Sequence, residues 1–155
     1  MILVSSCLAG FAVRYNGTDS LEDNVRTLLE RGEAIAVCPE LMGGFVTPRE
    51  PAEIVGGNGD DVLDGFARVI ERSGADVTEL YLRGAQLTLE QARETGADTV
   101  ILKENSPSCG SLAIYNGDFA GIKVDGRGVT SALLRRHGIR VLSENNYREA
   151  LKLTI

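Results

Sequence analysis

The sequence predicts an α/β fold, because amphipathic helical segments alternate with short apolar runs and a glycine separates each such pair. The helical segments end at Gly32, Gly96 and Gly138, and each glycine leads into a run rich in Val, Ile, Leu or Ala. Glycine just beyond a helix adopts the left-handed conformation at little cost. Strands that alternate with helices are joined by crossovers, which build a mainly parallel sheet with helices on its faces. We therefore expect a Rossmann-like three-layer domain, with about four strands and a small hairpin or loop insertion, that spans residues 1–155 as a single domain.

Four apolar runs predict the strands of this sheet. They lie at residues 2–4, 34–37, 99–102 and 139–142. The first run is followed by a Cys-Leu-Ala-Gly segment rather than by a glycine-rich phosphate turn. The fingerprint of a dinucleotide-binding fold is therefore absent.

The helices are predicted from apolar residues that recur three or four positions apart. The first begins after Ser20. The second begins after Asp76, which has Glu79 three residues later, the spacing of a capping box. A last helix follows Asn146, which has Glu149 at the same spacing. Both pairs are expected to satisfy the free backbone N–H groups at a helix start.

Two segments interrupt the alternation. Residues 43–76 are rich in glycine and predict a long loop that holds a small helix or hairpin. Residues 113–127 contain Asn116-Gly117 between apolar runs, a typical signal for a tight β-hairpin turn. Long connections in compact domains often form lids or binding loops.

Composition excludes several functional classes. The chain has 155 residues, a net charge of −6 and an isoelectric point near 4.8. An acidic chain is a poor binder of the nucleic-acid backbone, which requires a basic face to release counterions. No apolar stretch approaches the roughly 20 residues of a membrane helix. The N-terminus carries no export signal, so we expect a cytoplasmic protein.

The three cysteines fall where expected strands end. Cys7 follows the first strand, Cys38 directly follows the second, and Cys109 lies in a Ser-Pro-Ser-Cys-Gly segment beyond the third. The carboxyl ends of parallel strands share one edge of a sheet, where ligands bind. We therefore expect the cysteines to meet at one site. The competing interpretation is core packing, because free cysteine is among the most buried residue types.

A shared thiolate site would favour an iron–sulfur cluster over zinc. Structural zinc sites need four ligands, and the single histidine, His137, stands at the basic end of a helix, where we expect it to act as a cap or surface residue. Three thiolates without a fourth protein ligand fit a [4Fe–4S] cluster that has one open iron. An open iron is a Lewis acid, and sulfur is its natural partner by softness.

Several motifs that include these cysteines resemble the family designated domain of unknown function 523. They are Val4-Ser-Ser-Cys-Leu-Ala-Gly10, Arg14-Tyr-Asn-Gly17, Cys38-Pro-Glu40, Thr47-Pro-Arg49, Leu102-Lys-Glu-Asn-Ser-Pro-Ser-Cys-Gly110 and Gly128-Val-Thr130. The similarity runs nearly from end to end, and its most specific part is the Ser-Pro-Ser-Cys-Gly block. One departure is Asn16, where many members have Asp.

Characterised members of that family are thiouracil desulfidases. The resemblance implies a [4Fe–4S] cluster held by Cys7, Cys38 and Cys109. It also implies removal of sulfur from a 2-thiouracil-type base, which leaves uracil and sulfide without net redox change. The implied partner is a small thiolated base. Thiolated tRNA is a less favoured substrate, because the chain is acidic and carries no added domain.

Five residues are candidates for chemistry and substrate binding. Glu40, two residues after a cysteine, is the first choice to move protons between water, ring nitrogen and sulfur. Ser106 is the second catalytic candidate, and Arg14, Arg49 and Ser108 are candidates to bind substrate. Each has a structural alternative: a helix-start carboxylate for Glu40, turn hydroxyls for the serines, and salt bridges for the arginines.

Two other functional classes stay open on the sequence alone. One is a thiol enzyme with Cys109 as its nucleophile, although no histidine lies near Cys109 in the sequence to activate it. The other is a non-catalytic module that binds a cluster or a small molecule. We also expect Lys103 and Glu104, which are adjacent in the sequence, to pair with each other.

Overall fold

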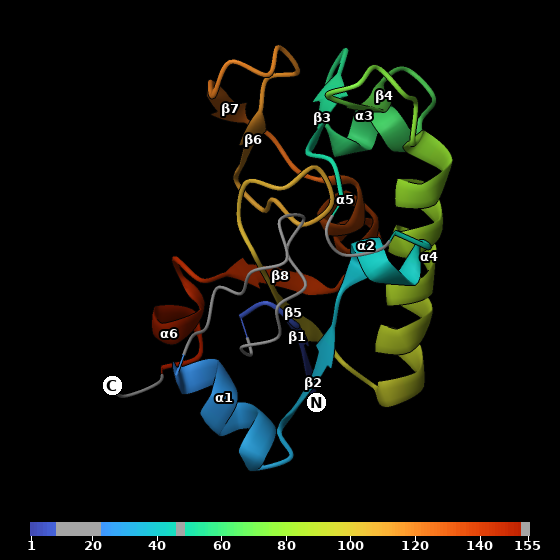
Figure 1. Cartoon of the computed structure of the whole chain (residues 1–155). Coiled ribbons are helices and arrows are strands. Elements are labelled where there is room, and N and C mark those ends of the chain that lie inside the picture. Colours follow the sequence, from blue (N-terminus) through green and yellow to red (C-terminus); the bar gives the residue numbers. More distant parts are fainter. Residues whose placement is uncertain (9–22, 46–48, 153–155) are drawn as a thin grey trace.

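A parallel sheet of four strands forms the centre of the molecule (Figure 1). The structure is a computed structural model that describes residues 1–8, 23–45 and 49–152. The strands are β1 (Ile2–Ser5), β2 (Ala34–Val37), β5 (Thr99–Leu102) and β8 (Arg140–Ser143), in the order β2-β1-β5-β8. All neighbours pair in parallel. The predicted sheet is confirmed, with the last strand shifted by one residue.

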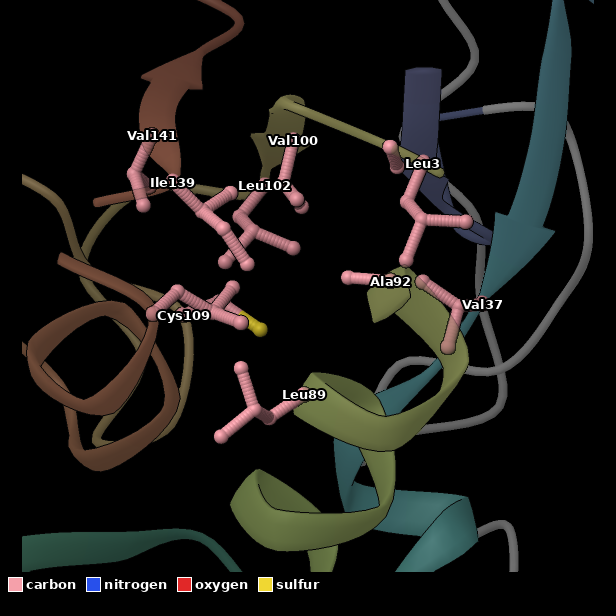
Figure 2. Close-up of a cluster of buried hydrophobic side chains, with 11 residues drawn as sticks. Leu3, Val37, Leu89, Ala92, Val100, Leu102, Cys109, Ile139 and Val141 are labelled. Carbon is pink, nitrogen blue, oxygen red and sulfur yellow. The ribbon is translucent and has the colours of Figure 1, made fainter. Parts of the chain in front are cut away.

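Helices cover both faces of this sheet, because its side chains alternate in direction. One face packs on α4 (Thr78–Thr95) and α5 (Val129–Arg136), with Leu3 of the sheet facing Ala92 of α4 (Figure 2). The neighbouring strand residues point the other way. They pack on α1 (Asp23–Glu30) and α6 (Tyr147–Ala150). The expected three layers are therefore present.

The segment 43–76 is more regular than a long loop. It holds β3 (Ala52–Val55), the short helix α3 (Gly59–Leu63) and β4 (Arg68–Glu71), and β3 pairs with β4 in antiparallel fashion. Asn58 caps α3 in a capping box. The expected small helix and hairpin are thus both present in one unit. This unit packs against the N-terminal half of α4, which links it to the central sheet.

The second insertion is a hairpin, but its turn differs from the prediction. β6 (Ala113–Tyr115) pairs with β7 (Lys123–Asp125) in antiparallel fashion, and residues 116–122 join them. Asn116-Gly117 opens this loop and does not make a two-residue turn. The Gly117 N–H donates to Glu53 Oε1 over 2.9 Å, so the loop is tied to β3.

Both predicted capping boxes are wrong. α4 begins at Thr78, and Asp76 Oδ1 accepts hydrogen bonds from the Thr78 N–H and hydroxyl. Asn146 makes no cap, because its Oδ1 accepts from the backbone N–H of Ser143. In each case the cap side chain accepts a hydrogen bond from another backbone N–H instead. The left-handed glycines at 32, 96 and 138 are as predicted. Among the described residues, no helix combines the length and apolarity needed to cross a membrane.

A pair of glycines lets a further short helix, α2 (Pro39–Met42), lie directly against α4. A Cβ atom on Gly84 would overlap the Pro39 carbonyl oxygen, and one on Gly43 would overlap the Leu80 carbonyl oxygen. Backbone therefore meets backbone at this crossing. The contact fixes the position of the residues that begin α2.

We predict that Gly84→Ala destabilises the protein by about 1–3 kcal/mol, because overpacking outweighs the gain in helix propensity. The midpoint of urea denaturation, followed by circular dichroism, measures this change. Gln86→Ala, at an exposed position of the same helix, is the control and should change the free energy of unfolding by less than about 0.5 kcal/mol. A Gly84→Ala protein as stable as the wild type would contradict the close crossing.

Candidate active site

A cavity of about 380 Å³ opens beyond the carboxyl ends of β1, β2 and β5. All three cysteines line it: Cys7 follows β1, Cys38 follows β2, and Cys109 comes from the loop after β5. Its opposite wall comes from the β3–β4 unit and the loop between β6 and β7. The fold thus brings together three thiols that are distant in the sequence.

Local contacts place the first two thiols. The Ser5 hydroxyl lies 3.2 Å from Cys7 Sγ, and Cys7 is buried. Cys38 is the N-cap residue of α2, and Pro39 takes the first helical position, as proline favours. Burial raises the pKa of the Cys38 thiol, and the neighbouring charges of Glu40 and Cys7 raise it as well.

Cys109 is both a core residue and a cavity residue. Its side chain lies beside Leu89 and Leu102 in the main apolar cluster (Figure 2), so the core-packing interpretation holds for it in part. The Cys109 N–H donates to Ser106 Oγ over 2.7 Å, which fixes the loop. Burial raises the pKa of the Cys109 thiol well above its usual value, and the charges of Glu40 and Cys38 add to this.

The donor set fits an iron–sulfur cluster. Buried thiols that raise one another's pKa lose their protons only when a cation offsets the repulsion between the thiolates. Within the described residues, no three Cys, His, Asp or Glu side chains are close enough to share a single metal ion. A polynuclear cluster does not need such a contact, because each of its thiolates binds a different iron.

Glu40 is held by two side chains at the base of the cavity. Arg49 Nη2 lies 3.2 Å from Oε1, and Arg49 Nε donates to Oε2 over 3.3 Å. The Tyr81 hydroxyl, carried by α4, donates to the same Oε2 over 2.6 Å. The Arg49 side chain is 6% exposed and that of Glu40 is 13% exposed. These contacts orient the carboxylate in a nearly dry environment.

The two partners of Glu40 keep their protons. Burial raises the pKa of Tyr81 well above its usual value, and the negative charge of Glu40 contributes to the same shift. Burial alone would lower the pKa of Arg49, but the adjacent Glu40 carboxylate raises it overall. Both side chains therefore remain hydrogen-bond donors to Glu40 throughout the neutral pH range.

The structure separates the sequence-predicted residues into three groups. Glu40, Arg49 and Ser106 line the cavity, and Arg49 makes the salt bridge that was its structural alternative. Ser108 does not line it: the side chain is buried, and its hydroxyl lies 2.8 Å from that of Thr130. The structure therefore does not place Ser108 at the cavity where we expect the substrate to bind. Arg14 lies outside the described residues.

Ser106 lines the cavity and makes the contacts of a turn hydroxyl, which was its structural alternative. Its Oγ accepts hydrogen bonds from the N–H groups of Ser108 and Cys109, as a turn hydroxyl does. Both bonds use the lone pairs of the oxygen, so the hydroxyl proton is available as a donor. His137 is at the C-terminal end of α5, as predicted, and its Nδ1 lies 3.0 Å from Arg93 Nη2.

Lys103 and Glu104 do not pair with each other. Lys103 Nζ contacts Glu144 at 2.6 Å. Glu104 turns inward, and its Oε1 accepts hydrogen bonds from the backbone N–H groups of residues 111–113, while its Oε2 accepts from the Ser111 hydroxyl. Adjacent residues on a strand end point in opposite directions, which explains why the prediction was wrong.

Sequence reasoning missed several residues of the site, among them Ser5, Asn105 and Tyr81. Ser5 and Asn105 line the cavity. They belong to the same sequence motifs as Cys7 and Ser106, so these motifs could have identified them. Tyr81 gave no such signal, because its position on the apolar face of a helix predicts an ordinary core residue. Only its hydroxyl, directed at Glu40, distinguishes it.

The outer wall of the cavity is also fixed by buried polar contacts. Glu53 Oε1 accepts hydrogen bonds from the N–H groups of Gly117 and Phe119. The Arg72 guanidinium lies 5.7 Å from the centre of the Phe119 ring. Arg72 and Phe119 both line the cavity, so this wall presents an aromatic ring together with a cation.

Three comparisons with known proteins agree with this geometry. The sequence profile of the 2-thiouracil desulfurase family matches residues 2–146. An uncharacterized protein of Bacillus subtilis (strain 168), YbbK, is 58% identical over 151 residues, which cover 97% of this chain and all of YbbK. The solved structure of a [4Fe-4S]-dependent thiouracil desulfidase, TudS, matches with a TM-score of 0.85 at 45% identity, and the match covers 99% of this chain and 98% of that chain.

The resemblance inferred from the cysteine motifs is thereby confirmed. The family profile covers the segments that carry all three cysteines and Glu40, and the solved relative has the same fold over nearly its whole length. This chain belongs to the 2-thiouracil desulfurase family.

Proposed function

We propose that this protein is a [4Fe-4S]-dependent desulfidase that removes sulfur from a small thiolated pyrimidine base such as 2-thiouracil. The observation that carries the proposal is the cavity in which three thiols and the clamped carboxylate of Glu40 meet. The family profile and the solved relative support it. In the reaction, one water replaces the thiocarbonyl sulfur, hydrogen sulfide leaves, and no electrons are transferred.

Cys7, Cys38 and Cys109 would hold the cluster, one thiolate to each of three irons. When bound, the cluster supplies a Lewis-acidic iron without a protein ligand, which withdraws electron density from the thiocarbonyl through its sulfur. The protein walls exclude bulk water from the buried thiols. The three side chains also set which face of the cavity the sulfur of the substrate must approach.

Glu40 is the proposed proton carrier. Its carboxylate would accept a proton from the water that attacks the thiocarbonyl carbon and return it to the leaving sulfur or a ring nitrogen. Arg49 and Tyr81 hold two sides of the carboxylate, so it accepts the proton in one orientation. The Ser106 hydroxyl can still donate a hydrogen bond, and it would orient the water or the base.

A thiol enzyme is the weaker alternative. A nucleophilic cysteine needs a lowered pKa, which a neighbouring base or cation provides. Burial raises the pKa of both Cys38 and Cys109 here. His137 is exposed at the end of α5, where it contacts Arg93. The thiols are therefore suited to metal binding rather than to attack on a substrate.

We also propose that residues 1–155 act as one desulfidase domain in the cytoplasm. The family profile spans nearly the whole chain, and the β3–β4 unit and the central sheet both contribute to one cavity. The three cysteines form no disulfide with one another, which suits a reducing compartment.

Replacement of any one cysteine, for example Cys38→Ala, should remove the bound iron and leave the fold intact. The apolar core of this domain does not include the cluster, so the far-ultraviolet circular dichroism should stay at the wild-type level. Iron and sulfide are measured after anaerobic purification. Single variants that retain full iron content would place the ligands elsewhere.

Glu40→Gln should lower the rate of desulfuration by about 10²- to 10⁴-fold, the usual contribution of a general acid–base group. Iron content should not change, because the substitution removes no thiolate. Glu79→Gln, at an exposed position on α4, is the matched control and should retain full activity. Unchanged turnover in Glu40→Gln would assign the proton transfer to Ser106 or solvent. Loss of iron would instead make Glu40 a support for Cys38.

Tyr81→Phe should lower turnover by roughly 10- to 100-fold, since a hydrogen bond to a charged group contributes on the order of 1.5–3 kcal/mol. The loss should appear in kcat rather than in KM. In the Glu40→Gln background the same substitution should have no further effect, because the carboxylate that it positions is gone. Equal effects of Tyr81→Phe in both backgrounds would show that Tyr81 acts independently of Glu40.

A further inference from the structure

Asn105 occupies an unusual position at the cavity. It lies between Glu104 and Ser106 in the loop that leads to Cys109, and it lines the cavity. Its φ angle is +76°, in the left-handed region that favours glycine. Asparagine is one of the few other residues that tolerate this region. Asparagine therefore adopts the conformation that the loop requires and still places an amide at the cavity.

The backbone on both sides of Asn105 is held firmly. Glu104 is 5% exposed and accepts hydrogen bonds from three consecutive backbone N–H groups and one hydroxyl. Ser106 accepts two further backbone hydrogen bonds. The backbone of Asn105 itself forms a parallel bridge to Ile114. The loop therefore holds the backbone of Asn105 in a fixed position. Ligand binding should then cost the loop little conformational entropy.

The Asn105 amide is uncommitted, unlike most of the charged groups that line the cavity. Glu40 and Arg49 bind each other, Lys103 binds Glu144, and Glu53 binds backbone N–H groups. Within the described part of the chain, the half-buried Asn105 side chain has no hydrogen-bond partner. It thus offers one free donor and one free acceptor to whatever enters the cavity.

We propose that Asn105 is the specificity-determining residue that binds the amide-like edge of the base, the ring N–H and the adjacent carbonyl. This inference rests on the proposed function. A carboxamide matches that edge with two antiparallel hydrogen bonds, the pairing by which Asn and Gln read base edges elsewhere. In 2-thiouracil, N3–H lies between the thiocarbonyl and the C4 carbonyl. Two bonds at that edge therefore fix the thiocarbonyl carbon relative to Glu40 and the cysteines.

The test compares wild type, Asn105→Gly and Asn105→Asp on 2-thiouracil and on N3-methyl-2-thiouracil. Glycine keeps the backbone conformation and removes the amide. Aspartate keeps the size and removes the donor. Both should lower kcat/KM for 2-thiouracil roughly 10- to 100-fold, mainly through KM, at unchanged iron content. The wild type should prefer 2-thiouracil over the methylated base, and both variants should lose most of this preference.

Asn145→Gly is the matched control, because Asn145 is exposed and does not line the cavity; its kinetics should equal those of the wild type. A measurement without turnover uses uracil, which retains the same N3–H and carbonyl edge. Its dissociation constant for the cluster-loaded protein, from calorimetry, should rise by a similar factor in Asn105→Gly.

The outcomes separate this inference from the proposed function. The wild type could bind uracil more tightly than Asn105→Gly does and still release no sulfide from 2-thiouracil. That result would support the inference and overturn the proposed function. Normal turnover in both variants, within about twofold of wild type, would overturn the inference alone. Loss of discrimination with undiminished kcat/KM for 2-thiouracil would also overturn it, because the methyl group would then have been excluded by size and not by hydrogen bonding.

Discussion

The parallel pairing of β1, β2 and β5 is the constraint on which the site depends. Parallel strands end at the same edge, so each residue that follows a strand enters one shared space. This rule brings Cys7 and Cys38 to the shared edge, because each lies within two residues of its strand end. Cys109 requires the further turn that Ser106 stabilises through the Cys109 N–H. A change in strand order would separate the thiols while leaving every helix intact.

Electrostatics explains why the cavity combines buried thiols with a clamped carboxylate. Burial raises the pKa of the Cys38 and Cys109 thiols, and the negative charge of Glu40 raises both further, so these two thiols favour the protonated form. A cationic group is needed to hold three thiolates there. Arg49 neutralises Glu40 locally, which would separate the proposed proton carrier from the charge of the proposed cluster. Burial disfavours free thiolates. It also strengthens the attraction between thiolates and a bound metal cation, relative to the same groups in water.

α4 connects the two halves of the molecule. Its C-terminal half packs on the sheet and its N-terminal half on the β3–β4 unit, so the inner and outer walls of the cavity share one support. The close crossing of Gly43 and Gly84 brings α2 against this helix. Tyr81, one turn before Gly84, then reaches Glu40. The carboxylate proposed as the proton carrier is therefore positioned by a helix that carries none of the three cysteines.

Sequence by itself determined the parts of this protein that follow from local pattern. Apolar runs and helix-ending glycines predicted all four strands of the sheet, and strand ends located the three cysteines and Glu40. Long-range contacts decided the rest: Glu53 ties a distant hairpin loop to β3, and Tyr81 meets Glu40 across 41 positions of the chain. Periodicity reports which side of a helix is buried but not which atom it meets there. The partner of a buried hydroxyl, and the free amide of Asn105, are set by packing between elements, and only the tertiary structure decides them.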